Sequence, residues 1–243
     1  MLLNKRIIKN RENYVSDITH DFRSPLTSIR GYAEALRDGT ISRDDQDKYL
    51  SIIIRLSDRL VRMTDDMMAL NKLSNNSVLI TETCFDINAL ISESINLEEL
   101  NTSAKRITVR TFLSEEAAMV YADSVKIQRV LMNLIDNAVK FSFDGSNVDI
   151  STALQDDHVL VSVRDYGIGI SEKQRARIFD RYYKTEHASL PATYGSGLGL
   201  SIVKEILELH HQTITVSSEE GKGSIFSFTL PKARQAGQPC QAT

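Results

Sequence analysis

The segment NLIDNAVKF, residues 133–141, places two asparagines and a lysine on one side of a predicted helix. Asn133, Asn137 and Lys140 are spaced four and three residues apart, so they share a face, and the apolar residues between them form the other side. Asparagine is a poor helix former, so two on one stripe need a reason. Either this face is simply solvated, or its amide oxygens hold magnesium and its lysine meets phosphate, because hard cations take oxygen ligands and share them with phosphates.

Two glycine clusters follow this helix in the chain. DYGIGI, residues 165–170, comes directly after the apolar run VLVSV, and GSGLGLS, residues 195–201, opens a predicted helix. Glycines let a backbone approach a ligand closely, and a helix N-terminus offers free N–H groups and a positive dipole to phosphates. The clusters therefore indicate a nucleotide. Neither matches the P-loop or the G-x-G-x-x-G pattern, which disfavours those two nucleotide-binding folds.

The hydrophobic periods around these motifs predict an α+β domain. Helices with mostly antiparallel strands form a sandwich of two layers. The expected helices are 87–103, 123–140 and 199–210, and the expected strands are a short one ending the linker, 106–112, 147–154, 158–165, 212–218 and 223–230. We expect a linker at 75–85, the sandwich domain at 86–232 and a disordered tail at 233–243.

The first 74 residues carry a different period. Apolar residues recur at a 3-4 spacing from Val15 to Leu36 and again from Tyr49 to Leu70, and Gly39 interrupts the two runs. This pattern predicts a helical hairpin over residues 1–74. Two helices with such seams bury little apolar surface unless another pair of helices packs against them. A homodimer that completes a four-helix bundle is therefore one interpretation. Packing of the hairpin against the rest of the same chain is the other.

Composition excludes several classes of protein. The 243 residues include 29 Lys and Arg against 32 Asp and Glu, which excludes a nucleic-acid surface. Cys84 and Cys240 have no metal-ligand spacing and indicate neither a zinc site nor a disulfide framework. No apolar run approaches the roughly 20 residues of a membrane span, so we expect a soluble, cytoplasmic chain without membrane contact of its own. The basic start NKRIIKNR, residues 4–11, suits either a solvated helix or the cytoplasmic piece of a membrane sensor.

The order of these motifs resembles the Bergerat-type (GHKL) ATP-binding domain, which sensor histidine kinases share with gyrase-type topoisomerases, Hsp90-type chaperones and MutL-type repair proteins. Two further segments single out the histidine kinases. THDFRSPL, residues 19–26, is similar to their H-box, and IFDRYYKT, residues 178–185, is similar to their F-box. The resemblance covers about residues 10–231. It implies a multidomain chain, with a phosphoacceptor hairpin followed by an ATP-binding sandwich.

The resemblance also implies roles for individual residues of the ATP site. Asn137 matches the magnesium ligand, with Asn133 and Lys140 beside it, and Asp165 matches the acid that accepts a hydrogen bond from the adenine amino group. The remaining implied ATP-site residues are Gly167 and Gly169 at the adenine pocket, Gly195, Gly197, Leu198 and Gly199 at a lid over the phosphates, Tyr183 beside it, and Lys184 near the γ-phosphate. The implied cofactors are ATP and Mg²⁺.

In the H-box, the resemblance makes His20 the phosphoacceptor and Asp21 its general base. His20 falls at the exposed f position of the heptad, where an imidazole offers a neutral nucleophile. Ser24 replaces the threonine that the family more often has and that is linked to dephosphorylating the partner, so phosphatase activity is an open question. Pro25 lies on the apolar seam and is expected to kink the helix.

The function implied is a histidine kinase that phosphorylates His20 and passes the phosphoryl group to an aspartate of a response regulator receiver domain. Transfer within one subunit or across a homodimer both remain open. An ATPase clamp would instead carry a catalytic glutamate where Asn133 stands, and a scaffold would have a degenerate ATP site. His158, His187, His210 and His211 are expected to have structural or solvent roles.

Overall fold

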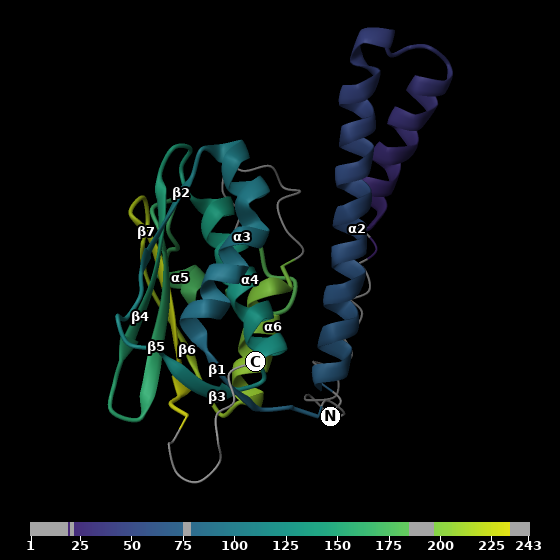
Figure 1. The fold of residues 1–243 in the computed structure, drawn as a ribbon. Helices are drawn as coiled ribbons and strands as arrows, with labels where there is room; N and C mark the ends of the chain where they lie inside the picture. Colours follow the sequence, from purple (N-terminus) through teal and green to yellow (C-terminus); the bar gives the residue numbers. More distant parts are fainter. Residues whose placement is uncertain (1–18, 20–21, 75–78, 185–196, 234–243) are drawn as a thin grey trace. The chain divides into compact units, whose positions relative to one another are not determined.

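The computed structural model describes residue 19 and residues 22–74, 79–184 and 197–233. These residues fall into two compact units, a helical hairpin and a larger α/β unit, and each is described by itself. The predicted order of a helical hairpin followed by an α+β sandwich is confirmed (Figure 1). No helix within the described ranges combines the length and the hydropathy that a membrane span requires.

The hairpin consists of a helix over residues 22–37, a short 3-10 helix η1 (Arg43–Asp45) and the long helix α2 (Gln46–Ser74). The turn between them is set by Gly39, whose φ is +80°, and by the Asp38 carboxylate, which accepts hydrogen bonds from the N–H and hydroxyl of Thr40. The rings of Tyr32 and Tyr49 lie 5.2 Å apart and join the two helices near this turn. The paired apolar seams therefore close on each other, as their spacing predicts.

Pro25 is buried within the first helix, and residues 22–37 are helical on both sides of it. Because proline has no N–H, the helix lacks one of its backbone hydrogen bonds at this point. One turn further on, the hydroxyl of Ser28 donates to the carbonyl oxygen of Ser24 at 3.2 Å. The helix therefore continues through the proline; the kink expected there stays a prediction.

The larger unit contains one five-stranded sheet and one two-stranded sheet. The five strands lie in the order β2-β4-β5-β7-β6, with β2 and β4 parallel and the other neighbours antiparallel, while β1 pairs with β3. The elements are β1 (Thr83–Asp86), α3 (Ile87–Lys105), β2 (Thr108–Phe112), β3 (Met119–Ala122), α4 (Ser124–Phe141), β4 (Asn147–Leu154), β5 (His158–Asp165), α5 (Glu172–Arg175), α6 (Gly199–Leu209), β6 (Ile214–Glu219) and β7 (Gly223–Pro231).

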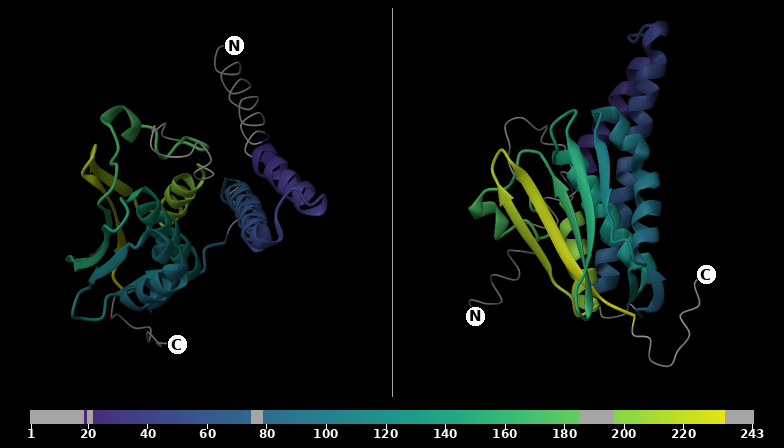
Figure 2. Two further views of the ribbon diagram at one scale, coloured as in Figure 1. Left: turned by 90° about the horizontal axis from the view of Figure 1, so that it is seen from above. Right: turned by 60° about the vertical axis from the view of Figure 1, so that its left-hand side comes forward.

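The core lies between the five-stranded sheet and three helices. Figures 1 and 2 show α3, α4 and α6 on the same face of that sheet, and each of them contacts a strand of it. Along β4 and β5 every second residue is buried, which is the period of a strand with one face toward a core. Helix α4 buries its apolar side, including Leu131, Leu134 and Ile135, and leaves its polar face outside this core.

Most predicted elements lie where the sequence placed them, but two short elements and the state of one cysteine differ from the prediction. The bounds predicted for two strands, 147–154 and 158–165, are confirmed as β4 and β5. The short elements β3 and α5 were not predicted. The sequence indicated no disulfide framework, and this expectation is wrong at Cys84, which is disulfide-bonded; Cys240 and the predicted disordered tail beyond 233 lie outside the described residues.

Replacing Leu131 by alanine should lower the free energy of unfolding of the larger unit by about 2 to 5 kcal/mol, because a fully buried leucine leaves a cavity. Val125→Ala is the matched control on the same helix: Val125 is 74% exposed, so its loss should change stability by less than about 0.5 kcal/mol. Hydrogen exchange of the β5 amides measures both values. Equal losses in the two variants would contradict the burial assigned to α4.

Candidate functional site

Helix α4 carries the polar face that the sequence singled out. The Asn133 side chain is half-buried and donates from Nδ2 to the carbonyl oxygen of Arg129 at 2.9 Å, which leaves its Oδ1 directed elsewhere. Asn137 is also half-buried, and its amide has no hydrogen-bond partner among the residues that the structure describes. Lys140 lies one turn further on, with its ammonium group 5.8 Å from the ring centroid of Phe141. A half-buried amide without a partner suits a ligand such as hydrated Mg²⁺.

Asp165 ends β5 and is buried, with 4% of its surface exposed. Its Oδ1 accepts a hydrogen bond from the N–H of Gly167 at 3.0 Å. Burial raises the pKa of this carboxyl to about 6, although hydrogen bonds from Gly167 and from the backbone and hydroxyl of Ser224 act in the opposite direction. The carboxylate is thus buried and held by donors from Gly167 and Ser224.

Sequence reasoning missed the hydroxyl groups that support Asp165. Ser224 is buried, and its Oγ lies 3.0 Å from that of Ser218. Ser218 also donates to the carbonyl oxygen of Gly223 at 2.9 Å and accepts from the N–H of Ile170 at 2.8 Å. These contacts tie the turn between β6 and β7 to the DYGIGI loop. The available signal was the pair of serines flanking the glycine-rich turn SEEGKGS, residues 218–224.

The glycines of DYGIGI are required by contacts within the protein itself. A Cβ at Gly167 would lie 1.9 Å from the carbonyl oxygen of Phe141, at the end of α4, where Ile168 N–H also donates to that oxygen at 3.2 Å. Gly169 has a φ of +67°, and a Cβ there would lie 2.0 Å from the carbonyl oxygen of Glu219. The close approach expected of these glycines is therefore present, but the partner described is protein backbone.

The N-terminus of α6 meets the polar face of α4. A Cβ at Gly199 would lie 2.7 Å from Oδ1 of Asn133 and 3.9 Å from Nδ2 of Asn137. Just before it, Gly197 has a φ of +70° and Leu198 is buried. The free N–H groups of the first turn of α6 are therefore placed beside the two asparagine amides. Gly195 and the predicted lid beyond Lys184 lie outside the described residues.

The F-box segment is connected to both the sheet and α6. The rings of Phe179 and Phe226 meet edge to face at 6.5 Å, and the guanidinium of Arg181 binds the carboxylate of Glu205 at 2.6 Å. Tyr183 and Lys184 follow, both half-buried, and Tyr183 lies under the Arg177 guanidinium at 4.5 Å. This segment therefore fixes the start of the predicted lid.

The predicted phosphoacceptor segment belongs to the hairpin. His20 and Asp21 lie outside the described residues, and Ser24 is half-buried in the first helix. The structure thus brings together the residues predicted for the nucleotide, on α4, after β5 and at the start of α6. Within the described ranges no group of three or more His, Cys, Asp or Glu could hold a metal.

The site combines a buried carboxylate, two asparagine amides and the N-terminus of a helix, and these groups can together bind a nucleotide. Asp165 can accept from an exocyclic amino group, Asn137 can ligate a metal, and the N–H groups at Gly199 can meet phosphate oxygens. The amides of Asn133 and Asn137 lie on the half-buried polar face of α4, outside the apolar core.

Comparison with known proteins finds two family models along the chain. Residues 122–234 match the model described as histidine kinase-, DNA gyrase B- and HSP90-like ATPase. Residues 10–76 match the model of the His Kinase A (phospho-acceptor) domain. The two matches follow each other in the order in which the helical hairpin and the α/β unit occur.

Similar proteins include curated sensor kinases and solved histidine kinase structures. The sensor protein kinase WalK of Staphylococcus haemolyticus is 34% identical over 232 residues, which are 93% of this chain and 38% of that protein. The sensor histidine kinase WalK of Bacillus subtilis is 32% identical, with 93% and 38% covered. The chain therefore spans well under half of the length of these relatives.

Among solved structures, the catalytic domain of histidine kinase ThkA is 32% identical with a TM-score of 0.56, covering 64% of this chain and 97% of that one. The histidine kinase AdeS of Acinetobacter baumannii has a TM-score of 0.71 at 23% identity, covering 88% and 98%. ThkA in complex with the response regulator protein TrrA has a TM-score of 0.71 at 24% identity, covering 94% and 64%. The last two similarities concern the fold alone.

Gly167→Ala should destabilise the larger unit by about 3 kcal/mol or more, because the added methyl group would collide with backbone atoms of Phe141 and Ser142. Gly31→Ala is the control. Gly31 lies in a helix, and a Cβ there would meet nothing within 4 Å, so alanine should raise the free energy of unfolding by about 0.5 to 1 kcal/mol. Denaturant unfolding of each variant measures the difference. A well-tolerated Gly167→Ala would contradict the close contact between this loop and α4.

The raised pKa of Asp165 should make unfolding depend on pH. Between its ordinary value of 3.8 and about 6, the folded state holds a proton that the unfolded state has lost. The stability that this group contributes is therefore full below pH 3.8 and is lost as pH rises through 6, by at most about 3 kcal/mol. Asp165→Asn does not titrate, so the stability difference between parent and variant, measured by denaturation across this range, isolates the effect. A difference independent of pH would count against the burial of this carboxyl.

Proposed function

The chain belongs to the sensor histidine kinases, and on that premise we propose that it is an ATP-dependent protein-histidine kinase that phosphorylates its own His20 and passes the phosphoryl group to an aspartate of a response regulator. The observation that carries the proposal is the convergence of Asp165, the Asn133–Asn137 face and the N-terminus of α6 in one unit. The phosphoacceptor domain is assigned to residues 1–74, the linker to 75–85 and the ATP-binding domain to 86–232.

In this proposal each predicted residue of the larger unit has a role toward Mg·ATP. Asp165 accepts a hydrogen bond from the adenine amino group, and Asn137 with Asn133 and Lys140 faces the metal and the phosphates. The magnesium ion, when bound, neutralises charge on the phosphates. The loop around Gly195, Gly197 and Leu198 lies over the phosphates, Tyr183 borders it, and Lys184 approaches the γ-phosphate. Catalysis of such a transfer consists chiefly of positioning and charge neutralisation.

The reacting group is the imidazole of His20. Its Nε2 lone pair forms the new N–P bond while the bond between the γ-phosphorus and the oxygen of ADP breaks. Asp21 accepts a hydrogen bond from Nδ1–H and thereby orients the ring and stabilises its positive charge. Transfer proceeds either within one subunit or across a dimer. Pro25 then acts as a hinge beside the phosphoacceptor.

A homodimer is supported by a second apolar stripe on the hairpin. The paired seams leave several large apolar side chains exposed, each one residue after a seam position. They are Leu26, Leu50, Ile54, Val61 and Met68, with exposed fractions between 47% and 60%. A stripe displaced by one residue from the intramolecular seam faces a different neighbour, and a second hairpin would cover it as in a four-helix bundle.

The partner we propose is a receiver domain, as in the ThkA complex with its response regulator. The phosphoryl group of His20 would pass to an aspartate of that domain. Phosphatase activity toward the regulator would involve Ser24, whose side chain is half-buried beside the phosphoacceptor turn. We further propose that the chain is the cytoplasmic part of a plasma-membrane sensor, which the basic segment NKRIIKNR at residues 4–11 suits.

Incubation of the protein with γ-labelled ATP should yield label that is labile in acid and stable in base, as expected of a phosphohistidine. His20→Ala should abolish this label while leaving binding of a fluorescent ATP analogue unchanged. His158→Ala is the matched control, because that histidine starts β5 far along the chain and has no proposed role. Label retained in His20→Ala would overturn the assignment, and hydrolysis of ATP without any label would favour an ATPase clamp.

A further inference from the structure

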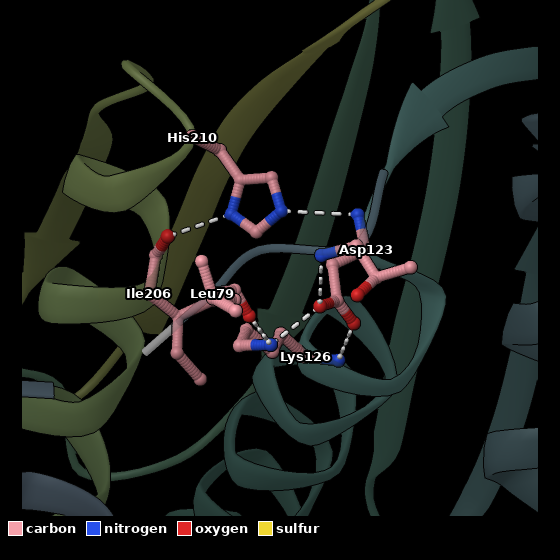
Figure 3. A network of polar contacts seen from close by, with 6 residues as sticks. Leu79, Asp123, Lys126, Ile206 and His210 are labelled. Atoms are coloured by element: carbon pink, nitrogen blue, oxygen red, sulfur yellow. Dashed lines mark hydrogen bonds and ion pairs between the residues drawn. The ribbon is translucent and has the colours of Figure 1, made fainter. Parts of the chain in front are cut away.

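His210 lies just past the end of α6 and is buried, with 5% of its surface exposed. Its Nδ1 is 2.8 Å from the carbonyl oxygen of Ile206, and its Nε2 is 3.1 Å from the backbone nitrogen of Asp123, at the start of α4 (Figure 3). A carbonyl oxygen can only accept, and a backbone N–H can only donate. The ring is therefore neutral, with its proton on Nδ1 and an acceptor lone pair on Nε2.

This contact lies at one end of the packing between α6 and α4. At the other end of α6, Gly199 lies so close to Asn133 that a Cβ would be 2.7 Å from its Oδ1. Asp123 precedes Asn133 along α4, and His210 follows Gly199 along α6, so the two helices run antiparallel between two fixed points. Each residue of a helix advances the axis by about 1.5 Å. A slip of α6 by even one residue would therefore break both contacts.

We propose that His210 is a positioning residue for nucleotide binding. By accepting the Asp123 N–H it sets the register of α6 on α4, and with it the placement of the first N–H groups of α6 beside the asparagine amides. His210 itself touches neither nucleotide nor metal in this proposal. The inference rests on the proposed function, since it concerns the same ATP site and adds a residue remote from it.

The carboxylate of Asp123 does not contribute to this register, because it is engaged with other groups. It caps α4 by accepting from the N–H of Lys126 at 3.1 Å, binds the Lys126 ammonium, and accepts from the N–H of Thr81 at 3.1 Å. Burial acts to raise the pKa of this carboxyl, but the hydrogen bonds from Lys126 and Thr81 outweigh it, so its pKa lies below the usual value. The carboxylate thus holds the end of the linker, and the backbone N–H of the same residue holds His210.

Lys126 provides an internal control for this separation of roles. Its ammonium group also donates to the carbonyl oxygen of Leu79, so it fastens the linker without touching His210 (Figure 3). Lys126→Met removes the linker contacts and leaves the Asp123 N–H in place. His211→Gln is a second control, because His211 is exposed, has a φ of +56° and makes no side-chain contact with α4 among the described residues.

The test uses the full chain and equilibrium binding of a fluorescent ATP analogue. His210→Asn keeps only the donor toward Ile206 and should weaken binding about tenfold or more, whereas His210→Gln, whose amide oxygen reaches the Nε2 position, should stay within about threefold of the parent. Lys126→Met and His211→Gln should bind like the parent. In the same variant the KM for ATP should rise while kcat at saturating ATP is retained, because the change alters the register of α6 on α4 and not the reacting groups.

Two outcomes would overturn the inference. Parental affinity in a folded His210→Asn variant would show that the register does not depend on this contact, as would equal losses of affinity in the Asn and Gln variants. Nitrogen NMR of the parent protein supplies a readout that needs no variant: a proton on Nε2 of His210 would also exclude the proposed acceptor role. Failure of the parent protein itself to bind the analogue would refute the proposed function instead.

Discussion

The candidate nucleotide site depends on one close approach of backbone to backbone. The loop after β5 passes the end of α4 at Gly167 with no room for a side chain, since a Cβ there would lie 1.9 Å from the Phe141 carbonyl oxygen. A β-bridge between Ser142 and Gly167 and hydrogen bonds from the Lys105 ammonium to the last carbonyls of α4 hold the same junction. The asparagine face and Asp165 lie on opposite sides of it. Any residue larger than glycine would separate the two halves of the site.

The buried carboxyl of Asp165 sets a second constraint, because a charged group in a poorly solvated place opposes folding. The protein limits this cost with donors from Gly167 and Ser224, yet the pKa is still raised to about 6. At neutral pH the group is ionised and under-solvated, which strengthens its preference for an added donor. The binding capacity and the loss of stability therefore have the same physical origin. Ser224, next to the β6–β7 turn, reduces the loss by donating to this carboxyl from its backbone and its hydroxyl.

The sequence predicted those parts of the molecule that depend on local pattern. The bounds of β4 and β5 were predicted from the sequence, and buried residues alternate with less buried ones along most of each strand; Asn133 was found because polar residues at helical spacing share a face. Elements β3 and α5 have only four residues each, too few for a period to emerge. Ser224 and His210 were not predicted as site or positioning residues. Their importance comes from partners distant in the chain, Asp165 and Asp123, and a hydroxyl or an imidazole alone does not reveal such a partner.

The hairpin combines tight packing with a local defect in its hydrogen bonding. Pro25 is buried on the apolar seam, so it contributes to packing while supplying no N–H to the backbone hydrogen bonds of the helix. Just before Pro25, the carbonyl oxygen of Ser24 accepts a hydrogen bond from the Ser28 hydroxyl. The missing N–H is therefore a local defect at Pro25, since residues 22–37 are helical on both sides of it. In the proposed function, this local defect is the point at which the helix bends beside the phosphoacceptor, while the apolar seam on either side of it stays packed.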